Sequence, residues 1–395
     1  MSSLLVAVGI ALSCVLLVPS AFFMIECLAS RRRGRPEMIP VRAPKVAILV
    51  PAHDEAQSIE NTLAELMQAV DAGMRVLVVA DNCSDDTAKR AAIAGARVIE
   101  RNDPSKIGKG YAIAYGVRAL EHESPDVVVI LDADCHIDAF SLRRIADLAY
   151  QTGKPVQAEY TMAPSSDALL SRLSAFAFAV RNRVRPRGLK RMGVPVHLAG
   201  TGMAFPFRLL RSAPNLDGHL AEDQLLGLEL TLAGRAPILA EEAMVTSCLP
   251  STAAALRRQR GRWEGGSLSI LRSHLPRVLR DAIRYRRGKL VGVALDLSIP
   301  PLAMLTLFCA LALGFLGIAA LLGASPLFVV LGSLPLVCVA IGVGVAWSRV
   351  GRELIGLEQL ACAPLYVLWK VPLYLGMALR GIPTRWERTE RERIE

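Results

Sequence analysis

The sequence predicts an α/β domain with a mostly parallel sheet, set between hydrophobic segments at the two ends of the chain. Short runs of β-branched residues alternate with segments of helical period between residues 46 and 134. This alternation is typical of a parallel sheet covered by helices on both faces. The chain has 395 residues and is 52% hydrophobic, with a mean hydropathy of +0.37. Because this exceeds the composition of a soluble protein, we expect part of the chain to lie in lipid.

The first hydrophobic segment, residues 4–24, is predicted to be an uncleaved membrane anchor within an N-terminal region of residues 1–30. As a helix it is long enough to cross about 30 Å of hydrocarbon. Unlike a secretory signal peptide, it has no positive charge before it and no small-residue cleavage site after it. The basic sequence RRRGR follows at residues 31–35. Because Lys and Arg gather on the cytoplasmic side, we expect the N-terminus outside and the middle domain in the cytoplasm.

Two more hydrophobic segments, residues 291–322 and 326–347, predict two transmembrane helices in the region 291–347. The short connection between them carries no charge, whereas arginines gather after Trp347. This difference in charge predicts that the chain after Trp347 lies on the cytoplasmic side. The expected location is therefore the inner, or plasma, membrane, with a cytoplasmic middle domain.

The last region, residues 352–395, is predicted to be an interfacial or re-entrant segment followed by a cytosolic tail. Its apolar part contains Glu358, Lys370 and prolines, which disfavour a simple crossing. A third C-terminal crossing is the alternative. Lys370, like Asp296 in the preceding hydrophobic segment, is expected to extend toward a membrane surface rather than to line a pore.

The net charge of +10 and the eight cysteines narrow the classes of partner and site. The basic residues cluster near the hydrophobic segments, without the aromatic-studded sheet or recognition helix of a nucleic-acid-binding protein. We therefore expect anionic lipid head groups and a phosphorylated substrate as partners, and no nucleic acid. The cysteines show no paired CxxC spacing, so they are expected to be reduced and structural.

Acidic residues follow three of the predicted strands, in PAHDE (51–55), in the sequence that begins at Asp81, and in LDAD (131–134). The carboxyl ends of parallel strands meet at one edge of a sheet, where ligands bind. Like charges repel unless a cation compensates them. The sequence therefore predicts a divalent cation at this edge.

The spacing of Asp132 and Asp134 suits Mg²⁺ or Mn²⁺, which are hard ions that prefer oxygen ligands and phosphate. The neighbouring Cys135 and His136 have poor zinc spacing and alternate in direction, so a Cys/His metal site is disfavoured. Asp138 is expected to cap the following helix rather than to bind metal.

Six motifs in order, PAHDE, ADNCSDDT, LDAD, AGTGMAF, AEDQ and QRGRW, resemble those of family 2 glycosyltransferases over residues 44–265. The resemblance implies the GT-A fold, with a Rossmann-like, mostly parallel sheet. It also implies an inverting enzyme that uses a nucleotide-diphosphate sugar, most often a UDP-sugar, together with Mg²⁺ or Mn²⁺.

The resemblance assigns donor-binding roles to residues from several motifs. Asp81 matches the aspartate that contacts uracil, although a turn and helix cap formed with Ser84 or Asp85 is a second interpretation of that stretch. Asp134 matches the direct metal ligand, and Asp132 lies near the ribose or donor sugar and shares the metal site. The residues expected to bind the nucleotide sugar are Pro51, His53, Glu55, Asp81, Lys109, Asp132, Gln259 and Arg262. Lys109 stands at a glycine-flanked helix start that favours a diphosphate, with a solvated loop as the alternative.

The resemblance also assigns the catalytic and acceptor residues. Asp223 is the expected general base, with Glu222 beside it, and the alternative is that the pair only caps the following helix. The residues expected to bind the acceptor are Gly200, Thr201, Gly202 and Trp263. In the QRGRW region, Arg257, Arg258 and Arg260 are instead expected on a basic membrane surface.

Residues 266–290 alternate apolar and basic positions at helical spacing, which predicts an amphipathic helix at the membrane surface. The acceptor is therefore expected to be a lipid or a lipid-linked glycan, as in exopolysaccharide or glycolipid synthesis. Three predicted transmembrane helices are too few to enclose a channel for a polymer, which favours the addition of a single sugar. A homo-oligomer or an export-complex partner could complete such a channel. The alternatives are a processive synthase of the cellulose or hyaluronan type and a non-catalytic scaffold on the same fold. A polyprenyl-phosphate sugar synthase is a further rival, against which the QxxRW motif argues.

Overall fold

The computed structural model describes residues 2–31, 43–213 and 221–381, apart from the side chains of residues 2 and 3. The chain divides into two compact units. The first comprises residues 1–31, 166–194 and 264–383, and the second comprises residues 32–165, 195–263 and 384–395. Some basic residues used to predict orientation, and the expected cytosolic tail, lie outside the described residues: Arg32, Arg33, Arg35, Arg385, Arg388 and the segment 382–395.

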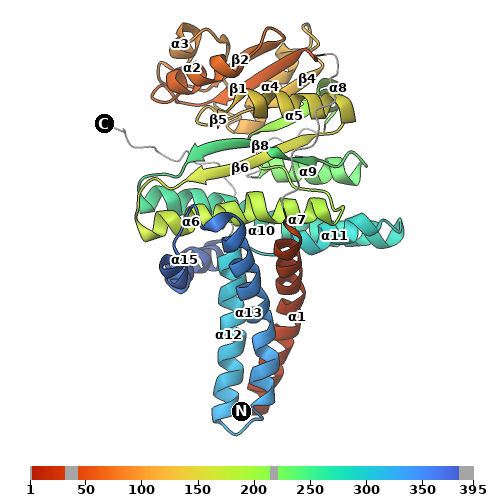
Figure 1. Cartoon of the computed structure of the whole chain (residues 1–395), viewed down its shortest axis with the longest axis vertical. Coiled ribbons are helices and arrows are strands. Elements are labelled where there is room, and N and C mark those ends of the chain that lie inside the picture. The colour runs from red at the N-terminus through yellow and green to blue at the C-terminus, as the bar shows by residue number, and fades with distance from the viewer. Residues whose placement is uncertain (1, 32–42, 214–220, 382–395) are drawn as a thin grey trace. The chain divides into compact units, whose positions relative to one another are not determined.

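An eight-stranded mixed sheet forms the centre of the second unit, in the order β3-β2-β1-β4-β7-β6-β8-β5 (Figure 1). Strand β1 pairs in parallel with β2 and β4, and β2 pairs in parallel with β3. Strand β7 is antiparallel to β4 and β6, whereas β8 is parallel to β6 and antiparallel to β5. The predicted α/β fold class is confirmed. The strands are β1 (Val46–Ala52), β2 (Met74–Asp81), β3 (Arg97–Arg101), β4 (Val127–Ile130), β5 (His136–Ile137), β6 (Val156–Ala163), β7 (Met203–Pro206) and β8 (Ile238–Cys248).

Helices cover this sheet, and its central strands β1 and β4 are buried at every position except the partly exposed Pro51, as their continuous β-branched runs predict. Helix α4 approaches β1 closely at Gly116, where a Cβ atom would lie 2.3 Å from Cδ1 of Leu49. Helix α5 begins after Asp138, whose carboxylate accepts the Ser141 N–H at 2.8 Å, so the predicted cap is confirmed. The helices are α2 (Ile59–Ala69), α3 (Thr87–Ile93), α4 (Lys109–Ala119), α5 (Ala139–Thr152), α8 (Phe207–Arg211), α9 (Glu222–Leu232) and the start of α10 (Ala253–Arg284).

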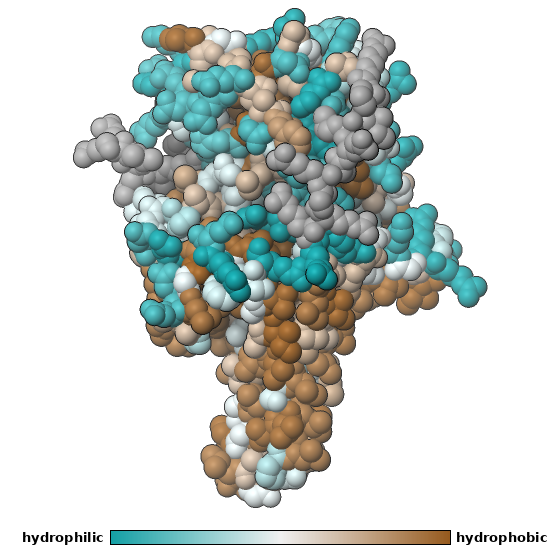
Figure 2. Space-filling view, in the orientation of Figure 1, coloured by the Kyte–Doolittle hydropathy of each residue, from teal (hydrophilic) through white to brown (hydrophobic). Residues whose placement is uncertain are grey.

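Long apolar helices dominate the first unit. Three of its described helices are long and apolar enough to cross a membrane, at Leu4–Ala29, Leu302–Leu321 and Leu327–Gly351. They belong to α1 (Ser2–Ala29), α12 (Leu302–Leu321) and α13 (Leu327–Ala346), which run side by side (Figure 1), and their outer surface is hydrophobic (Figure 2). The other elements are α6 (Leu169–Ala179), the π-helical turn η1 (Val180–Val184), α7 (Arg185–Arg191), the rest of α10, α11 (Gly288–Leu297), the π-helical turn η2 (Trp347–Gly351), α14 (Leu357–Ala361) and α15 (Ala363–Arg380).

The hydrophobic segment 291–322 differs from the single span that its composition predicts. It divides into α11 and α12, and the membrane-length part begins only at Leu302. The break contains Pro300 and Pro301. Proline disfavours helical conformation in the residue before it and lacks the N–H that would continue a helix. The two consecutive prolines therefore end the first helix.

Charged residues within the apolar segments are paired inside the first unit. Arg185 donates to the carboxylates of Glu26 and Asp296 at 2.7 and 2.6 Å. Lys370 is only 4% exposed and pairs with Glu264, which also accepts the Tyr374 hydroxyl at 3.0 Å. The expectation that Lys370 extends to a membrane surface was therefore wrong, because a carboxylate partner compensates its buried charge.

Candidate active site

The three acidic strand ends predicted from the sequence belong to neighbouring parallel strands. Strand β1 lies between β2 and β4 and is parallel to both. Asp81 is the last residue of β2, the PAHDE loop leaves β1, and Asp132 follows β4 by two residues. All three acidic stretches therefore lie at the same edge of the sheet, as their order in the sequence indicated.

The loop after β1 is joined to the end of β2. Nδ1 of His53 lies 2.6 Å from the backbone oxygen of Asp81. The backbone N–H of Glu55 donates to Oγ1 of Thr87 at 2.7 Å, and its carboxylate accepts the Ser58 hydroxyl at 2.8 Å. Pro51 stands near the end of β1, opposite Val79 of β2. Of the predicted residues in this loop, His53 therefore contacts Asp81 directly, whereas Glu55 is bonded to Thr87 and Ser58.

Asp81 has a partner that the sequence analysis missed. Its carboxylate is buried and forms an ion pair with Arg101, the last residue of β3, and it also accepts the Asn82 side-chain amide at 3.2 Å. Burial raises the pKa of Asp81, and the Arg101 charge opposes that rise. The Arg101 guanidinium also donates to the Lys106 carbonyl at 3.0 Å and lies 5.4 Å from the centre of the Tyr111 ring. Only the pairing of β2 with β3 reveals this contact.

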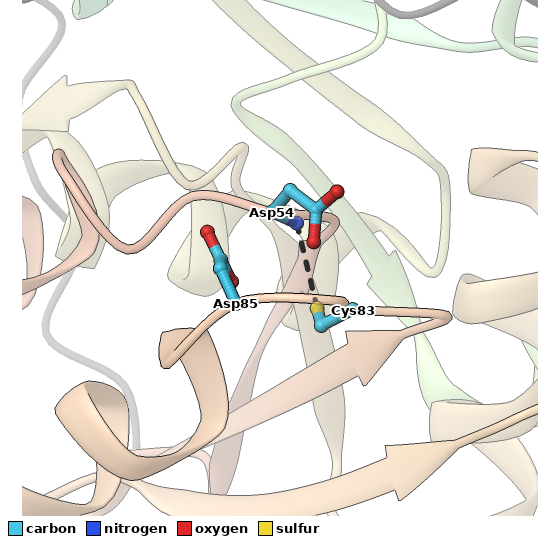
Figure 3. Close-up of side chains that lie close together, drawn as sticks. All are labelled: Asp54, Cys83 and Asp85. Carbon is cyan, nitrogen blue, oxygen red and sulfur yellow. Dashed lines mark hydrogen bonds between the residues drawn. The ribbon is translucent and has the colours of Figure 1, made fainter.

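A first group of potential metal ligands consists of Asp54, Cys83 and Asp85, drawn in Figure 3. Asp54 accepts the Ser84 N–H at 2.6 Å, and its own N–H donates to Sγ of Cys83 at 3.4 Å. Asp85 accepts the N–H groups of Ala56 and Thr87, at 3.1 and 3.0 Å. These carboxylates act as acceptors that join the two loops, and Asp85, one of the two predicted caps, receives the N–H of the first α3 residue.

The second group consists of Asp132, Asp134 and Cys135, whose ligand atoms all lie within 4.8 Å of one another. Burial, followed by the charges of Asp134 and Asp132, raises the pKa of the Cys135 thiol well above its ordinary value. The thiol therefore stays protonated, and the two carboxylates are the ionic oxygen donors. Such a donor set fits Mg²⁺ or Mn²⁺. Nδ1 of His136 instead lies 2.6 Å from Oε2 of Glu65.

Lys109, the first residue of α4, reaches the Asp132 carboxylate and forms an ion pair with it. Its ammonium also donates to the Gly200 carbonyl at 2.7 Å. Burial disfavours the charge on Lys109, but the nearby carboxylates of Asp132, Glu222 and Asp223 outweigh it and raise the pKa of Lys109. The Lys109 ammonium is therefore a fixed cation among these acids. The alternative that Lys109 lies in a solvated loop does not agree with these contacts.

Glu222 and Asp223 are the first two residues of α9, and the cap position before them is Ala221. A Cβ atom built on Gly200 would lie 3.3 Å from Oδ2 of Asp223 and 3.5 Å from Nζ of Lys109. Burial, together with the Asp223 charge, raises the pKa of Glu222 to about 7. The pair therefore stands beside Lys109 and the loop at Gly200 rather than at an isolated helix start.

The loop of residues 199–202 contains three predicted acceptor residues. The Thr201 side chain is completely buried, and its hydroxyl accepts the Asp132 N–H at 3.0 Å, so it supports the Asp132 turn. Gly202 has a φ of +63°, and a Cβ atom there would lie 2.5 Å from Cγ2 of Val245. Gly202 is therefore required for packing against β8, whereas Gly200, with a φ of +88°, faces Asp223 and Lys109.

The QRGRW motif lies on the first part of α10. Gln259 is buried, and the Arg262 charge acts on Glu222, which places Arg262 near the acidic pair. Arg260 is only 5% exposed and lies 5.4 Å from the centre of the Trp263 ring. The expectation of a membrane-surface role for Arg260 was wrong, because its side chain packs on that ring, whereas Arg257 and Arg258 are exposed.

Comparison with solved structures supports the fold. The mannosyltransferase PcManGT from Pyrobaculum calidifontis, solved in complex with GDP-Man and Mn²⁺, superposes with a TM-score of 0.56. The likeness covers 95% of this chain and 99% of that one, at 18% sequence identity. At this level of identity the likeness concerns the fold, which is of the GT-A type.

Sequence comparison gives shorter matches. An uncharacterized glycosyltransferase of Mycobacterium bovis is 36% identical over 118 residues, which are 28% of this chain and 50% of that protein. The chain thus spans about half the length of that relative. Glucosyl-3-phosphoglycerate synthase of Mycobacterium tuberculosis is 36% identical over 95 residues, which are 22% of this chain and 28% of the synthase. Residues 43–266 match the family described as "Glycosyltransferase like family 2" over more than half of the chain, and the protein belongs to that family.

Proposed function

We propose that the protein transfers a sugar from a nucleotide-diphosphate sugar to a lipid or lipid-linked glycan in the membrane, with inversion at the anomeric carbon. One observation carries this proposal: the Asp132 and Asp134 carboxylates, the Lys109 ammonium and the Asp223 carboxylate gather around the loop of residues 199–202. This arrangement combines a cation-binding pair, a fixed positive charge and a base within one site.

Asp132 and Asp134 are the residues that would hold Mg²⁺ or Mn²⁺. When bound, the metal would neutralise charge on the diphosphate of the donor. Lys109 adds a cation that is already held in place by Asp132 and the Gly200 carbonyl. Because the leaving nucleoside diphosphate gains negative charge as the glycosidic bond breaks, this preorganised cation stabilises the transition state more than the ground state. Arg262 is assigned as a second cation that binds the pyrophosphate. The nucleoside is assigned to the edge of the sheet around Asp81.

Asp223 would act as the general base. Its carboxylate takes the proton from the acceptor hydroxyl while that oxygen forms a bond to the anomeric carbon. The bond from that carbon to the nucleoside diphosphate breaks at the same time, and displacement from the opposite face inverts the configuration. Glu222, with its raised pKa, holds a proton more readily than an exposed glutamate. We assign the base to Asp223 because its carboxylate lies against the loop at Gly200, where a Cβ atom would be 3.3 Å from Oδ2.

Three features support a membrane-borne acceptor and a cytoplasmic site. The described residues include three helices of membrane-spanning length, and residues 266–290 carry alternating basic and apolar positions. The basic residues that begin at Arg31 favour a cytoplasmic position for the domain that follows. We therefore place the enzyme in the inner membrane, with its site on the cytoplasmic side and Trp263 stacking on the acceptor sugar.

Transfer of radiolabelled sugar in membranes that contain the full chain tests the proposal. A panel of UDP- and GDP-sugars is supplied with Mg²⁺ or Mn²⁺, and organic-extractable lipid is separated from polymer. Wild type is compared with Asp223→Asn and with Asp167→Asn, a matched change of a carboxylate that is 93% exposed. Label in lipid that is retained in Asp167→Asn and lost in Asp223→Asn would support the proposal. Label in long polymer would favour a processive synthase. Label that persists in Asp223→Asn would reject Asp223 as the base, and no label in wild type with any donor would favour a non-catalytic scaffold.

A further inference from the structure

We propose that Gln157, on strand β6, is a positioning residue that fixes the loop of residues 199–202 between the metal-binding carboxylates and Asp223. The inference rests on the proposed function, because it concerns the geometry of that reaction. Gln157 belongs to none of the six motifs, and it lies in the buried first part of β6, so the sequence alone does not indicate such a role.

The Gln157 side chain holds the loop from two directions. Its Oε1 accepts the Ala199 N–H at 2.8 Å, and its Nε2 donates to the Thr201 carbonyl at 2.9 Å. Nε2 also donates to the Ala158 carbonyl at 2.8 Å. Since one partner is a donor and the others are acceptors, the amide has a single orientation. With only 3% of the residue exposed, water cannot readily replace these bonds.

The backbone alone cannot make these contacts. Strand β6 pairs with β7 at Val156 and Gln157, and the Ala158 N–H then donates to the Gly202 carbonyl at 2.9 Å. Beyond that point the positive φ values of Gly202 and Gly200 turn the loop away from an extended conformation. The Gln157 side chain continues the hydrogen bonding where the ladder between the strands stops.

The loop that Gln157 holds contacts both halves of the proposed site. Its Gly200 carbonyl accepts the Lys109 ammonium, and its Thr201 hydroxyl accepts the Asp132 N–H. Gly200 also lies against Asp223, where a Cβ atom would be 3.3 Å from Oδ2. A shift of the loop would therefore change the position of the base relative to the metal-binding carboxylates and Lys109.

This arrangement predicts that replacing Gln157 slows the transfer step but leaves donor binding almost unchanged. The direct ion pair of Lys109 with Asp132 does not depend on Gln157, so nucleotide binding should persist when the side chain is replaced. Transfer should slow by about 10- to 100-fold, because displacements near 1 Å have effects of this size on reactions that depend on alignment. The KM for the donor should change by no more than about threefold, since the loss occurs in the transition state.

The test uses the full chain in membranes, with UDP or GDP and Mn²⁺ as binding probes and the donor identified by the panel as substrate. Gln157→Met keeps the length of the side chain and removes both hydrogen bonds to the loop. Gln157→Glu keeps the acceptor for the Ala199 N–H, and when it is assayed at a pH high enough to ionise the buried carboxyl it places an oxygen against the Thr201 carbonyl. Gln151→Met is the matched control, because Gln151 is exposed on α5.

The expected result is a large fall in kcat for both Gln157 variants, with nucleotide binding and donor KM near wild type and Gln151→Met unchanged. If Gln157→Met does not accumulate in membranes, Gln157→Glu decides the question alone. Transfer by Gln157→Glu within twofold of wild type would overturn the inference, as would loss of nucleotide binding equal to the loss of transfer. Absence of transfer by wild type would instead reject the proposed function, so the two failures are distinguishable.

Discussion

Two groups of acidic side chains lie at neighbouring strand ends of the second unit, and the fold uses them differently. Asp54 and Asp85 accept hydrogen bonds from amide groups of the loops after β1 and β2, so they join one loop to the other. Asp132 and Asp134 lie together after β4, and the partly buried Lys109 forms an ion pair with Asp132. The first group holds the loops at this edge of the sheet in place, and the second group concentrates negative charge at the same edge.

The comparison teaches that clustered carboxylates alone do not identify a metal site. Both groups satisfy the same distance condition with two aspartates and one cysteine. They differ in what their oxygens contact, because backbone amides already occupy Asp54 and Asp85 as acceptors. A carboxylate that holds a loop in place has less capacity left for a cation, because each amide N–H already occupies one of its acceptor sites.

The largest expected effect is that of Asp134→Asn on transfer. The change removes the charge of a proposed metal ligand while the shape of the side chain is retained. The transfer rate at saturating Mn²⁺ should fall by about 100- to 1000-fold, a range typical of losing one group that stabilises transition-state charge. Initial rates of labelled transfer in membranes measure this. A variant that keeps more than a tenth of the activity would remove Asp134 from the proposed metal site.

The second effect concerns stability rather than chemistry. Asp85→Ala removes the acceptor for the Ala56 and Thr87 N–H groups, and the unfolding free energy should decrease by about 1–3 kcal/mol. Thermal unfolding of the full chain in detergent detects this as a lower Tm. The Mn²⁺ concentration for half-maximal activity should stay unchanged. A changed Mn²⁺ dependence with an unchanged Tm would instead give the Asp54 group a role in metal binding.

The third effect depends on pH. Burial and Asp223 raise the pKa of Glu222 to about 7, so the folded protein binds this proton more tightly than the unfolded chain does. The associated stability is fully present below the ordinary pKa of a glutamate and is lost as the pH rises through 7. Glu222→Gln, which cannot ionise, should therefore gain unfolding free energy relative to wild type between pH 5 and pH 8, by on the order of 1–3 kcal/mol, which thermal unfolding detects as a higher Tm. A difference in Tm that does not change with pH would show that Glu222 is not perturbed.

The smallest effect is that of Asp138→Ala. This carboxylate is also close in sequence to Asp132 and Asp134, the proposed metal ligands, but it caps α5 through the Ser141 N–H. Its removal should lower the unfolding free energy by about 1 kcal/mol and leave the Mn²⁺ dependence unchanged. Thermal unfolding and a Mn²⁺ titration of transfer measure the two quantities. A shift in the Mn²⁺ titration would extend the metal site beyond Asp132 and Asp134.

Features that depend on local pattern could be predicted from the sequence. The runs of β-branched residues predicted the parallel strands around β1. Because acidic residues follow these strands in the sequence, they were predicted to lie at one edge of the sheet. The spacing around Asp138 gave its helix cap. Length and apolar composition gave three helices that could span a membrane, because hydropathy within one segment is enough for that inference.

Contacts between distant segments could not be predicted. Arg101 meets Asp81 across 20 residues, Gln157 meets Thr201 across 44, and Lys370 meets Glu264 across 106. Each of these side chains is polar and buried, and a polar residue in an apolar stretch does not name its partner. The sequence therefore suggests candidate residues for the chemistry, but it does not suggest the residues that hold those candidates in place.

The central claim is that Asp132 and Asp134, rather than Asp54 and Asp85, form the metal site. Electron paramagnetic resonance of Mn²⁺ bound to the full chain with UDP or GDP tests it most directly, using the matched variants Asp134→Asn and Asp54→Asn. The account predicts that wild type and Asp54→Asn bind Mn²⁺ alike, while Asp134→Asn loses the bound signal. Loss of the signal in Asp54→Asn with normal binding in Asp134→Asn would contradict it.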